Sequence, residues 1–318
     1  MTRLTNDTAT LVPRTSFGGP ALEFDFPGFR IGVAEYEEGP TGCTVFHFLE
    51  RAACATDVRG GSPGTLGGYE LVDAICLAGG SLYGLEAAAG VAAGLFAASG
   101  YSTAWTEIAL VSGAILFDYG RRANAVYPDK ALGRAALESA RAGIFPLGAR
   151  GAGRSATAGK AIAYEQGEPA GQGGAFRQVG PTKLAVFTAV NALGAIVDRS
   201  GAVVRGNLDS SATRRGYLEA LEERLAEGER PAPEPGSTTL TVLVTNQRLD
   251  LRELRQLGRQ VHSSMSRAIQ PFNALLDGDV LYAVTTAESE NPDLDVTALG
   301  ALGSELAWDA ALAAVSAD

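Results

Sequence analysis

The residues best suited to chemistry lie where a linker meets a strand. Residues 228–236 read GERPAPEPG, with three prolines and two glycines, and Ser237-Thr238-Thr239 lead from them into the strand pattern LTVLVTN. Cleavage before a hydroxyl residue there would leave an α-amine on that same residue. Such an amine has an ordinary pKa of about 7.7–8.0, so its neutral fraction can take the hydroxyl's proton. The junction therefore suggests a self-processing hydrolase, although a plain strand start has the same pattern.

Histidine chemistry is not favoured. The chain has two histidines, His47 in an apolar strand pattern and His262 in an amphipathic helix pattern, and both are interpreted as structural. A serine–histidine–aspartate triad would need one of them, yet no G-x-S-x-G sequence accompanies either. A hydrolase built on this sequence needs another base.

Glycine clusters and one pair of aspartates are weaker candidates. GGSLYG at 79–84 and GAGRSATAG at 151–159 lack the glycine patterns of phosphate-binding loops, so tight turns and close backbone contacts are the favoured interpretation. Asp277-Gly278-Asp279 resembles a fragment of a calcium loop without its other ligands, which favours a turn before a strand. Neither pattern predicts a bound phosphate or metal ion.

The elements that must position these residues occur in blocks rather than in strand–helix alternation. Strands are predicted at residues 30–48 (two strands around a turn), 182–190, 193–199, 240–246 and 279–286, and helices at residues 87–99, 130–143, 213–227, 250–265 and 295–315. Asp250 and Glu253 form a capping-box pattern at the start of one helix. The Ala- and Gly-rich run 87–99 is too short for a membrane span and predicts a buried helix. Blocks of this kind favour a layered α+β sandwich.

Composition and charge limit the class of protein. Of the 318 residues, 46% are hydrophobic and 19% charged, which is typical of a folded chain with one large or two modest domains. The net charge of −10 disfavours nucleic acid and an anionic membrane surface as partners. Three cysteines without metal-binding spacing, and an N-terminus without an apolar signal sequence, predict a cytoplasmic protein.

Long strings of sequence carry a family resemblance. They are FDFPGFRIGVAEYEEGPTG, CLAGGSLYGLEAAAGV, VYPDKALGRAALE, GAGRSATAGK, VVRGN, GSTTLTVLVTNQR, QVHSSMSRAIQPF, DGDVLYAVTT and TALGALGSELAWDA. From Phe24 to the C-terminus the chain resembles the L-aminopeptidase/D-esterase family of self-cleaving N-terminal-nucleophile hydrolases. Within that family it is most similar to the 6-aminohexanoate-oligomer endohydrolases.

The resemblance implies a nucleophile and a cleavage site. In the family the nucleophile stands seven residues before the threonine of a strand-end Thr-Asn pair, here Thr245-Asn246. This count selects Thr238 and implies that the Ser237–Thr238 bond is cut. Family members commonly carry Asn or Gly before the nucleophile, where this chain has Ser237. Ser237 itself would be the nucleophile if cleavage followed Gly236.

The resemblance also implies roles for other residues. Lys160 matches the active-site lysine, which would hold the threonine hydroxyl and keep the nearby amine neutral. Asn191 matches the asparagine that would hydrogen-bond the substrate carbonyl and its oxyanion. Tyr127 resembles a tyrosine that lines the same pocket. Asp277 and Asp279 match a carboxylate pair that would assist self-processing or hold the new ammonium group.

The implied fold is a four-layer αββα sandwich of the N-terminal-nucleophile hydrolase type. A single hydrolase domain, residues 1–318, would cut itself into a large subunit 1–237 and a small subunit 238–318 that stay associated. The resemblance implies a homo-oligomer of these cleaved heterodimers, commonly a tetramer, and no metal or organic cofactor. The implied reaction is hydrolysis of linear aliphatic amides such as 6-aminohexanoate (nylon-6) oligomers through an acyl-enzyme.

Three other functions stay open. An aminopeptidase for short peptides with small, D- or β-amino N-terminal residues would not cut an internal amide of a blocked oligomer. An acyltransferase related to ornithine acetyltransferase would transfer acyl groups to amines faster than to water. A non-catalytic binding protein would remain an intact chain.

Overall fold

The computed structural model describes residues 3–230 and 236–316. The strands are β1 (Ala21–Glu23), β2 (Phe29–Tyr36), β3 (Thr41–Val58), β4 (Thr65–Leu66), β5 (Leu71–Ala78), β6 (Val111–Ile115), β7 (Ile144–Pro146), β8 (Thr157–Ala158), β9 (Glu168–Pro169), β10 (Gln172–Val179), β11 (Thr182–Asn191), β12 (Ala195–Val197), β13 (Val203–Arg205), β14 (Thr238–Gln247), β15 (Ile269–Gln270) and β16 (Val280–Ser289). The helices are α1 (Glu86–Ala98), α2 (Lys130–Glu138), α3 (Tyr217–Ala226), α4 (Leu251–Ser264) and α5 (Val296–Ala313), with short 3-10 helices η1 (Ser81–Leu85), η2 (Trp105–Glu107), η3 (Tyr119–Arg121), η4 (Gly151–Gly153), η5 (Tyr164–Gln166) and η6 (Met265–Arg267).

The long strand β3 connects two stacked halves of the main sheet. Its first part pairs with β2 and β5, its last part pairs with β16, and its register against β5 shifts between His47 and Ala52. One half therefore contains β2, β5, β6 and β4, and the other contains β16, β14, β11 and β10. The Phe46 ring on β3 lies 5.3 Å from the Phe187 ring on β11, which joins the two halves face to face.

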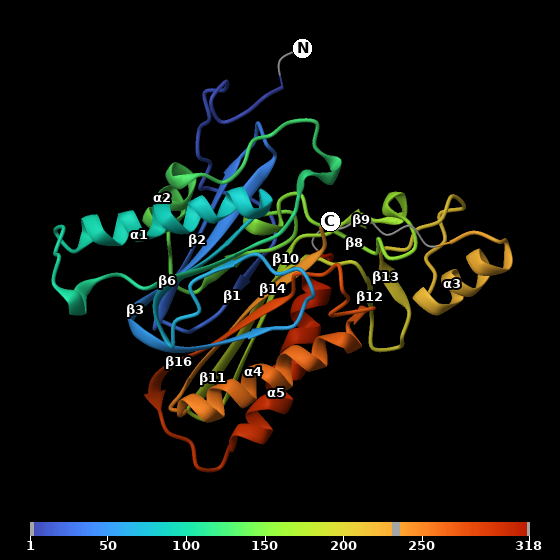
Figure 1. Cartoon of the computed structure of the whole chain (residues 1–318). Coiled ribbons are helices and arrows are strands. Elements are labelled where there is room, and N and C mark those ends of the chain that lie inside the picture. The colour runs from blue at the N-terminus through green and yellow to red at the C-terminus, as the bar shows by residue number, and fades with distance from the viewer. Residues whose placement is uncertain (1–2, 231–235, 317–318) are drawn as a thin grey trace.

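Three apolar cores separate four layers. One core lies between the two sheet halves, a second lies between β10, β11, β14 and β16 and helices α4 and α5, and a third lies between the other half and helices α1 and α2. Figure 1 shows the two helix pairs on opposite sides of the strands. The predicted α+β sandwich with four αββα layers is confirmed.

The apolar helix predicted at residues 87–99 is confirmed as α1, but only one side of it is buried. With the 3-10 turn η1 it forms one described stretch, Ser81–Ala98, that is long and apolar enough to span a membrane, and 33% of that stretch is buried. One side of α1 packs on α2, β5 and β6, while Ala89 and Phe96 on the other side are exposed. Ala and Gly occupy every face, so composition alone did not reveal which face packs.

Two other predictions differ from the structure in extent. The helix expected at 213–227 starts only at Tyr217, because the Asp209 carboxylate accepts the backbone N–H groups of Ser211 and Thr213 and forms a turn. The linker expected at 228–236 falls partly on residues 231–235, which lie outside the described residues. Helix α3 stands out to one side of the sandwich in Figure 1.

Candidate active site

The predicted nucleophile begins the central strand β14. Thr238 is the first residue of this strand, which runs between β11 and β16 and is buried along its whole length. Because β11 is antiparallel to β14, its last residue, Asn191, pairs directly with Thr238. Because β16 is parallel to β14, the residues just before it reach the same edge, and Ser237 forms a bridge with Asp277. Three segments far apart in sequence therefore meet at Thr238.

Lys160 reaches Asn191 from the segment after β8. Its Nζ donates to the backbone oxygen of Asn191 at 3.3 Å and to Oδ1 at 3.2 Å, and the lysine is buried. The Thr157 backbone N–H donates to the same Oδ1 at 3.0 Å. The lysine's own backbone N–H donates to Leu193 at 2.7 Å, which holds the segment in place. The Asn191 amide is thus oriented with its oxygen toward Lys160.

The nitrogen of the Asn191 amide faces two backbone carbonyls. Nδ2 donates to Phe117 O and to Gly236 O, each at 2.9 Å. Gly236 has φ of 108°, and a Cβ there would overlap the Phe117 ring, so only glycine fits this turn beside the predicted cleavage bond. The Gly236 carbonyl therefore uses one donor of the Asn191 amide.

The carbonyl of the predicted cleavage bond is hydrogen-bonded from two sides. Ser237 O accepts the backbone N–H of Gly278 at 2.8 Å and the Oγ of Thr238 at 2.5 Å. A Cβ on Gly278 would lie 2.7 Å from the Thr238 Oγ and 2.8 Å from the Ser62 oxygen, so a side chain at this position would disturb the contact. The backbone donor polarises this carbonyl, and the hydroxyl that could attack it lies beside it.

Asp277 and Asp279 flank Gly278 and are both buried. Asp277 accepts the backbone N–H groups of Leu193 at 3.2 Å and Ala274 at 2.9 Å, and Asp279 accepts those of Thr239 at 2.6 Å and Asn273 at 3.1 Å. Burial, together with the charge of Asp277, raises the pKa of Asp279 to about 8. Burial also raises the pKa of Asp277, while the Lys160 charge opposes that shift. At neutral pH the pair therefore holds a proton that it can exchange.

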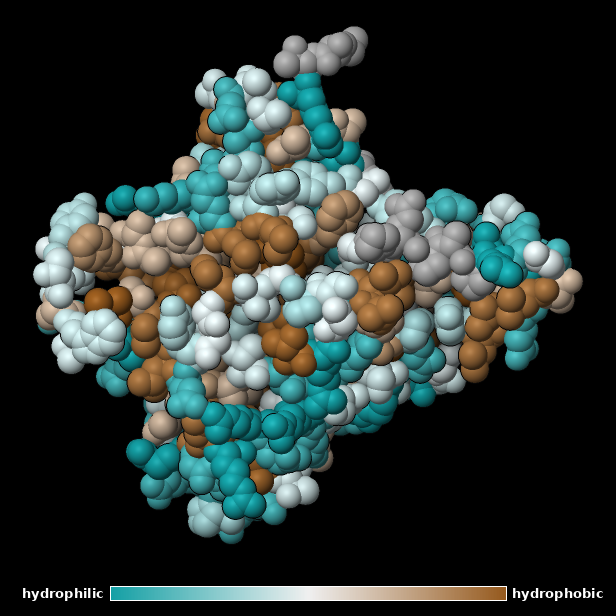
Figure 2. Space-filling model, viewed as in Figure 1, coloured by the Kyte–Doolittle hydropathy of each residue, from teal (hydrophilic) through white to brown (hydrophobic). Residues whose placement is uncertain are grey.

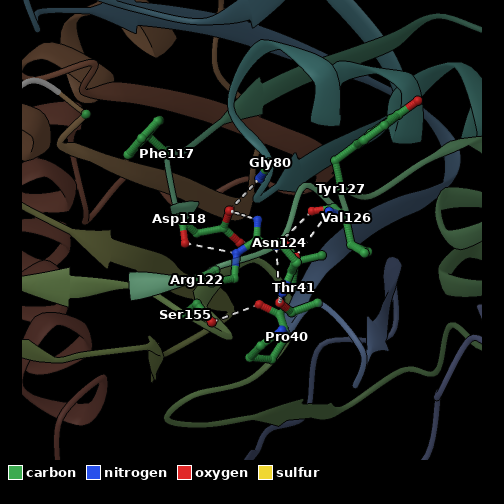
Figure 3. A network of polar contacts seen from close by, with 12 residues as sticks. Pro40, Thr41, Gly80, Phe117, Asp118, Arg122, Asn124, Val126, Tyr127 and Ser155 are labelled. Atoms are coloured by element: carbon green, nitrogen blue, oxygen red, sulfur yellow. Dashed lines mark hydrogen bonds and ion pairs between the residues drawn. The ribbon is translucent and has the colours of Figure 1, made fainter. Parts of the chain in front are cut away.

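Tyr127 makes its contacts elsewhere. Its hydroxyl donates to Glu86 at 3.0 Å and its ring lies 6.0 Å from the Tyr83 ring. Burial and the Glu86 hydrogen bond raise the pKa of Tyr127 to about 12, so its hydroxyl is protonated at neutral pH. In Figure 3 its ring points away from Phe117, the residue that contacts Asn191. Its role in the pocket stays a prediction.

A buried ion pair that the sequence did not reveal supports the Phe117 side of the site. Asp118 and Arg122 are buried and lie 2.5 Å apart. The Asp118 carboxylate also accepts the Thr41 hydroxyl at 2.6 Å and the Gly80 backbone N–H at 2.9 Å, and the network is drawn in Figure 3. These contacts fix the segment that presents the Phe117 carbonyl to Asn191. The string FDYGRR has no spacing that would have indicated this role.

The histidines and cysteines lie in structural surroundings. His262 is buried on α4, with Nδ1 2.9 Å from Asp57, and burial lowers its pKa. His47 is partly buried on β3 and its pKa is lowered by burial. The three cysteines are buried and free. The interpretation of His262 as structural agrees with its contact to Asp57, and that of His47 stays a prediction.

Comparison with known proteins gives a consistent result. The profile of Peptidase family S58 matches residues 24–317. The 6-aminohexanoate-oligomer endohydrolase of Agromyces sp. (strain KY5R) is 49% identical over 320 residues, which covers 97% of this chain and 90% of that protein.

Two solved structures share the fold at low sequence identity. A Burkholderia sp. β-aminopeptidase is 16% identical with a TM-score of 0.65, covering 95% of this chain and 90% of its own. The L-aminopeptidase D-Ala-esterase/amidase of Ochrobactrum anthropi, described as a variant of the Ntn hydrolase fold, is 15% identical with a TM-score of 0.65, covering 95% and 89%. The chain thus has an N-terminal-nucleophile hydrolase fold and belongs to peptidase family S58.

Proposed function

We propose that this protein is a self-processing amide hydrolase that cuts its own Ser237–Thr238 bond and then uses Thr238 as the N-terminal nucleophile. The observation that carries the proposal is the contact of the Thr238 hydroxyl with the Ser237 carbonyl, which also accepts the Gly278 N–H. Thr238 is favoured over Ser237 because the Ser237 hydroxyl has no hydrogen-bond partner among the described residues.

Self-cleavage follows from this arrangement as an N-to-O acyl shift. The Thr238 Oγ attacks the Ser237 carbonyl carbon and gives up its proton, while the Gly278 N–H stabilises the developing oxyanion. The C–N bond then breaks and the nitrogen of Thr238 takes up a proton. Water hydrolyses the resulting ester, which leaves a Ser237 carboxylate and a free Thr238 with amine and hydroxyl. We assign the proton transfers to the Asp277–Asp279 pair, since it holds an exchangeable proton at neutral pH.

Turnover of a substrate reuses the same groups. The neutral α-amine of Thr238 takes the hydroxyl's proton, Oγ attacks the substrate amide carbon, and the amine passes the proton to the leaving amine. Once Gly236 has moved, the N–H group of Asn191 that it used is available to the substrate carbonyl. The Lys160 ammonium beside Asn191 disfavours a second positive charge on the amine and so keeps it a base. Water then releases the acyl group from Thr238.

For the substrate we propose linear aliphatic amides such as 6-aminohexanoate oligomers. Support comes from the relative that is 49% identical along nearly the whole chain and carries that activity in its name. An aminopeptidase acting on short peptides is the second candidate, because the family is a peptidase family. A 6-aminohexanoate oligomer blocked at both ends separates the two, since only the endohydrolase cuts its internal amides.

The decisive experiment on self-processing is an intact-mass measurement under denaturing conditions. The wild-type chain is expected to give two fragments, the smaller beginning Thr-Thr-Leu-Thr, and Thr238→Ala is expected to give one uncut and inactive chain of 318 residues. Thr238→Ser is the matched control, because it keeps the hydroxyl and should still be cut. A small fragment that begins with Ser237 would move the nucleophile, and normal cleavage of Thr238→Ala would refute the assignment.

We further propose that the cleaved heterodimers assemble into a homo-oligomer through the exposed side of α1. Six large apolar side chains are exposed around this helix, here called the α1 face: Leu66, Leu82, Tyr83, Phe96, Tyr101 and Trp105. Figure 2 shows apolar residues gathered along α1. Large exposed apolar patches mark interaction sites in soluble proteins.

The cytoplasmic location expected from the sequence stays a proposal.

A further inference from the structure

The two residues before Thr238 mark the path of an acyl chain. In the proposed self-processing, the Ser237 acyl group moves onto the Thr238 Oγ as an ester, and in turnover the acyl group of a substrate forms an ester with that same oxygen. Once residues 236 and 237 have moved aside, the substrate's acyl chain therefore meets the groups that now surround them. This correspondence rests on the proposed function, in which Thr238 is the nucleophile of both reactions.

Counting atoms back from the ester relates residues 236 and 237 to an aliphatic acid. The Ser237 carbonyl carbon corresponds to carbon 1 of the acyl group, and the Ser237 Cα and nitrogen correspond to carbons 2 and 3. The carbonyl carbon of Gly236 then corresponds to carbon 4, and its Cα corresponds to carbon 5. Backbone bonds of roughly 1.3–1.5 Å are close in length to the carbon–carbon bonds of an alkyl chain. Carbon 5 of an acyl chain on this path thus reaches the place of the Gly236 Cα.

The Phe117 side chain lies against the Gly236 Cα. A Cβ on Gly236 would lie 2.5 Å from Cδ1 of the Phe117 ring and 2.8 Å from its Cγ, which is too close for any side chain. The Cα itself is therefore in van der Waals contact with the ring. An unbranched methylene at carbon 5 fits the same space and would bury apolar surface against the ring.

Neighbouring side chains hold the Phe117 ring in place. The ring packs edge-on against the Tyr119 ring at 5.7 Å, and the Arg122 guanidinium lies 4.4 Å from the centre of the Tyr119 ring. Arg122 is in turn paired with the buried Asp118 carboxylate. Figure 3 shows the Phe117 ring pointing away from this ion pair. The ring is thus an apolar wall whose position is set by a polar network behind it.

The atom at carbon 4 distinguishes an aliphatic chain from a peptide. The Gly236 carbonyl oxygen at this place accepts Asn191 Nδ2 at 2.9 Å. An acyl group of two α-amino acids would present a carbonyl there and use the same donor, whereas an aliphatic acyl group has a methylene. The aliphatic group thus leaves the Asn191 donor to the reacting carbonyl.

We propose that Phe117 determines specificity for the acyl chain, because its ring favours unbranched aliphatic acyl groups of at least five carbons. A 6-aminohexanoyl group is long enough to reach the ring. A single α- or β-amino acyl group, of the kind an aminopeptidase releases, ends at its amine on carbon 2 or carbon 3 and does not reach it. One side chain therefore separates the two candidate substrate classes by length.

Hydrolysis of the 4-nitroanilides of propanoic, butanoic, pentanoic and hexanoic acid tests this role. For the wild-type protein, kcat/KM should rise about tenfold from the butanoyl to the hexanoyl substrate and change less between propanoyl and butanoyl. Phe117→Ala should lower the hexanoyl-to-butanoyl ratio of kcat/KM by about the same factor. Phe17→Ala is the matched control and should keep the wild-type ratio, because Phe17 is also half-buried but contacts Arg14 and Arg150.

Phe117→Leu covers the case in which the alanine variant fails to cut itself, which the intact mass reveals. It keeps an apolar side chain in place and should lower the ratio by a smaller factor. An unchanged ratio in the Phe117 variant that cuts itself, an equal fall in Phe17→Ala, or a wild-type rise spread evenly over the four chains would each overturn the role of Phe117. A wild-type protein that hydrolysed none of the anilides would instead refute the proposed function, and this role with it.

Discussion

At the scale of single residues, the site is distinguished by a carboxyl group that stays protonated at neutral pH. Asp277 and Asp279 are buried side by side, and burial raises the pKa of Asp279 from its ordinary value of 3.8 to about 8. A carboxyl group with such a pKa keeps its proton at neutral pH and can donate it or take it back during a reaction. The backbone N–H groups of Thr239 and Asn273 oppose this shift without cancelling it. The proposed self-processing would thus have an acid and base that needs no histidine.

The raised pKa of Asp279 predicts how stability depends on pH. Between about pH 4 and pH 8 the folded chain keeps a proton that the unfolded chain has lost, so the free energy of unfolding should fall as pH rises. We expect this fall in the uncut Thr238→Ala protein, measured by urea unfolding at pH 5 and pH 8. Adding Asp279→Asn to this protein should reduce the fall in the free energy of unfolding between pH 5 and pH 8. Adding Asp293→Asn, at an exposed position, should leave that fall unchanged. Equal pH dependence in both double variants would contradict the assignment.

At the scale of elements, two loops hold the predicted cleavage bond in place. The segment before β16 accepts backbone N–H groups from the segment after β3, from Arg59 to Asp279 O at 3.1 Å and from Ser62 to Asp277 O at 2.8 Å. This pairing sets the position of the Gly278 N–H against the Ser237 carbonyl. On the other side of this bond, β14 begins at Thr238, which pairs with Asn191 of β11. The geometry of the bond therefore depends on where three strands begin or end.

Gly278→Ala should slow self-cleavage by about 100-fold, because a Cβ would displace the Thr238 hydroxyl or the Gly278 donor from the Ser237 carbonyl. The uncut chain should accumulate, measured by denaturing electrophoresis over a time course after synthesis. Gly18→Ala is the control, since nothing lies within 4 Å of a Cβ at that position. Wild-type cleavage of Gly278→Ala would show that this close contact is not needed.

At the scale of the whole molecule, the α1 face exposes large apolar side chains to water. Leu82 and Trp105 are 62% and 87% exposed, and the helix between them has Ala and Gly on every side. A protein interface of standard size buries about 800 Å² on each partner. The six side chains of the α1 face come from β4, η1, α1 and the segment after it.

Leu82→Glu should lower the mass of the assembly in solution, because a charge on the α1 face would have to be buried between copies. Light scattering after size-exclusion chromatography measures that mass. Leu218→Glu is the matched control, since Leu218 is also a well-exposed leucine but lies on α3. A monomeric wild-type protein, or equal dissociation in both variants, would contradict the proposed interface.

The sequence alone predicted the local features of this protein, and tertiary structure decided how they meet. The strand after the linker, the capping box at Asp250 and the apolar helix α1 follow from short-range patterns, because hydrogen bonding and side-chain periodicity act within a few residues. The roles of Thr238 and Lys160 came from family resemblance. The contact between Gly278 and the Ser237 carbonyl, and the support that Asp118 gives Phe117, depend on strand register and on loops distant in sequence. The sequence likewise did not indicate which side of α1 is exposed. An Ala- and Gly-rich helix is apolar all round, so its buried face is decided only by packing in the tertiary structure.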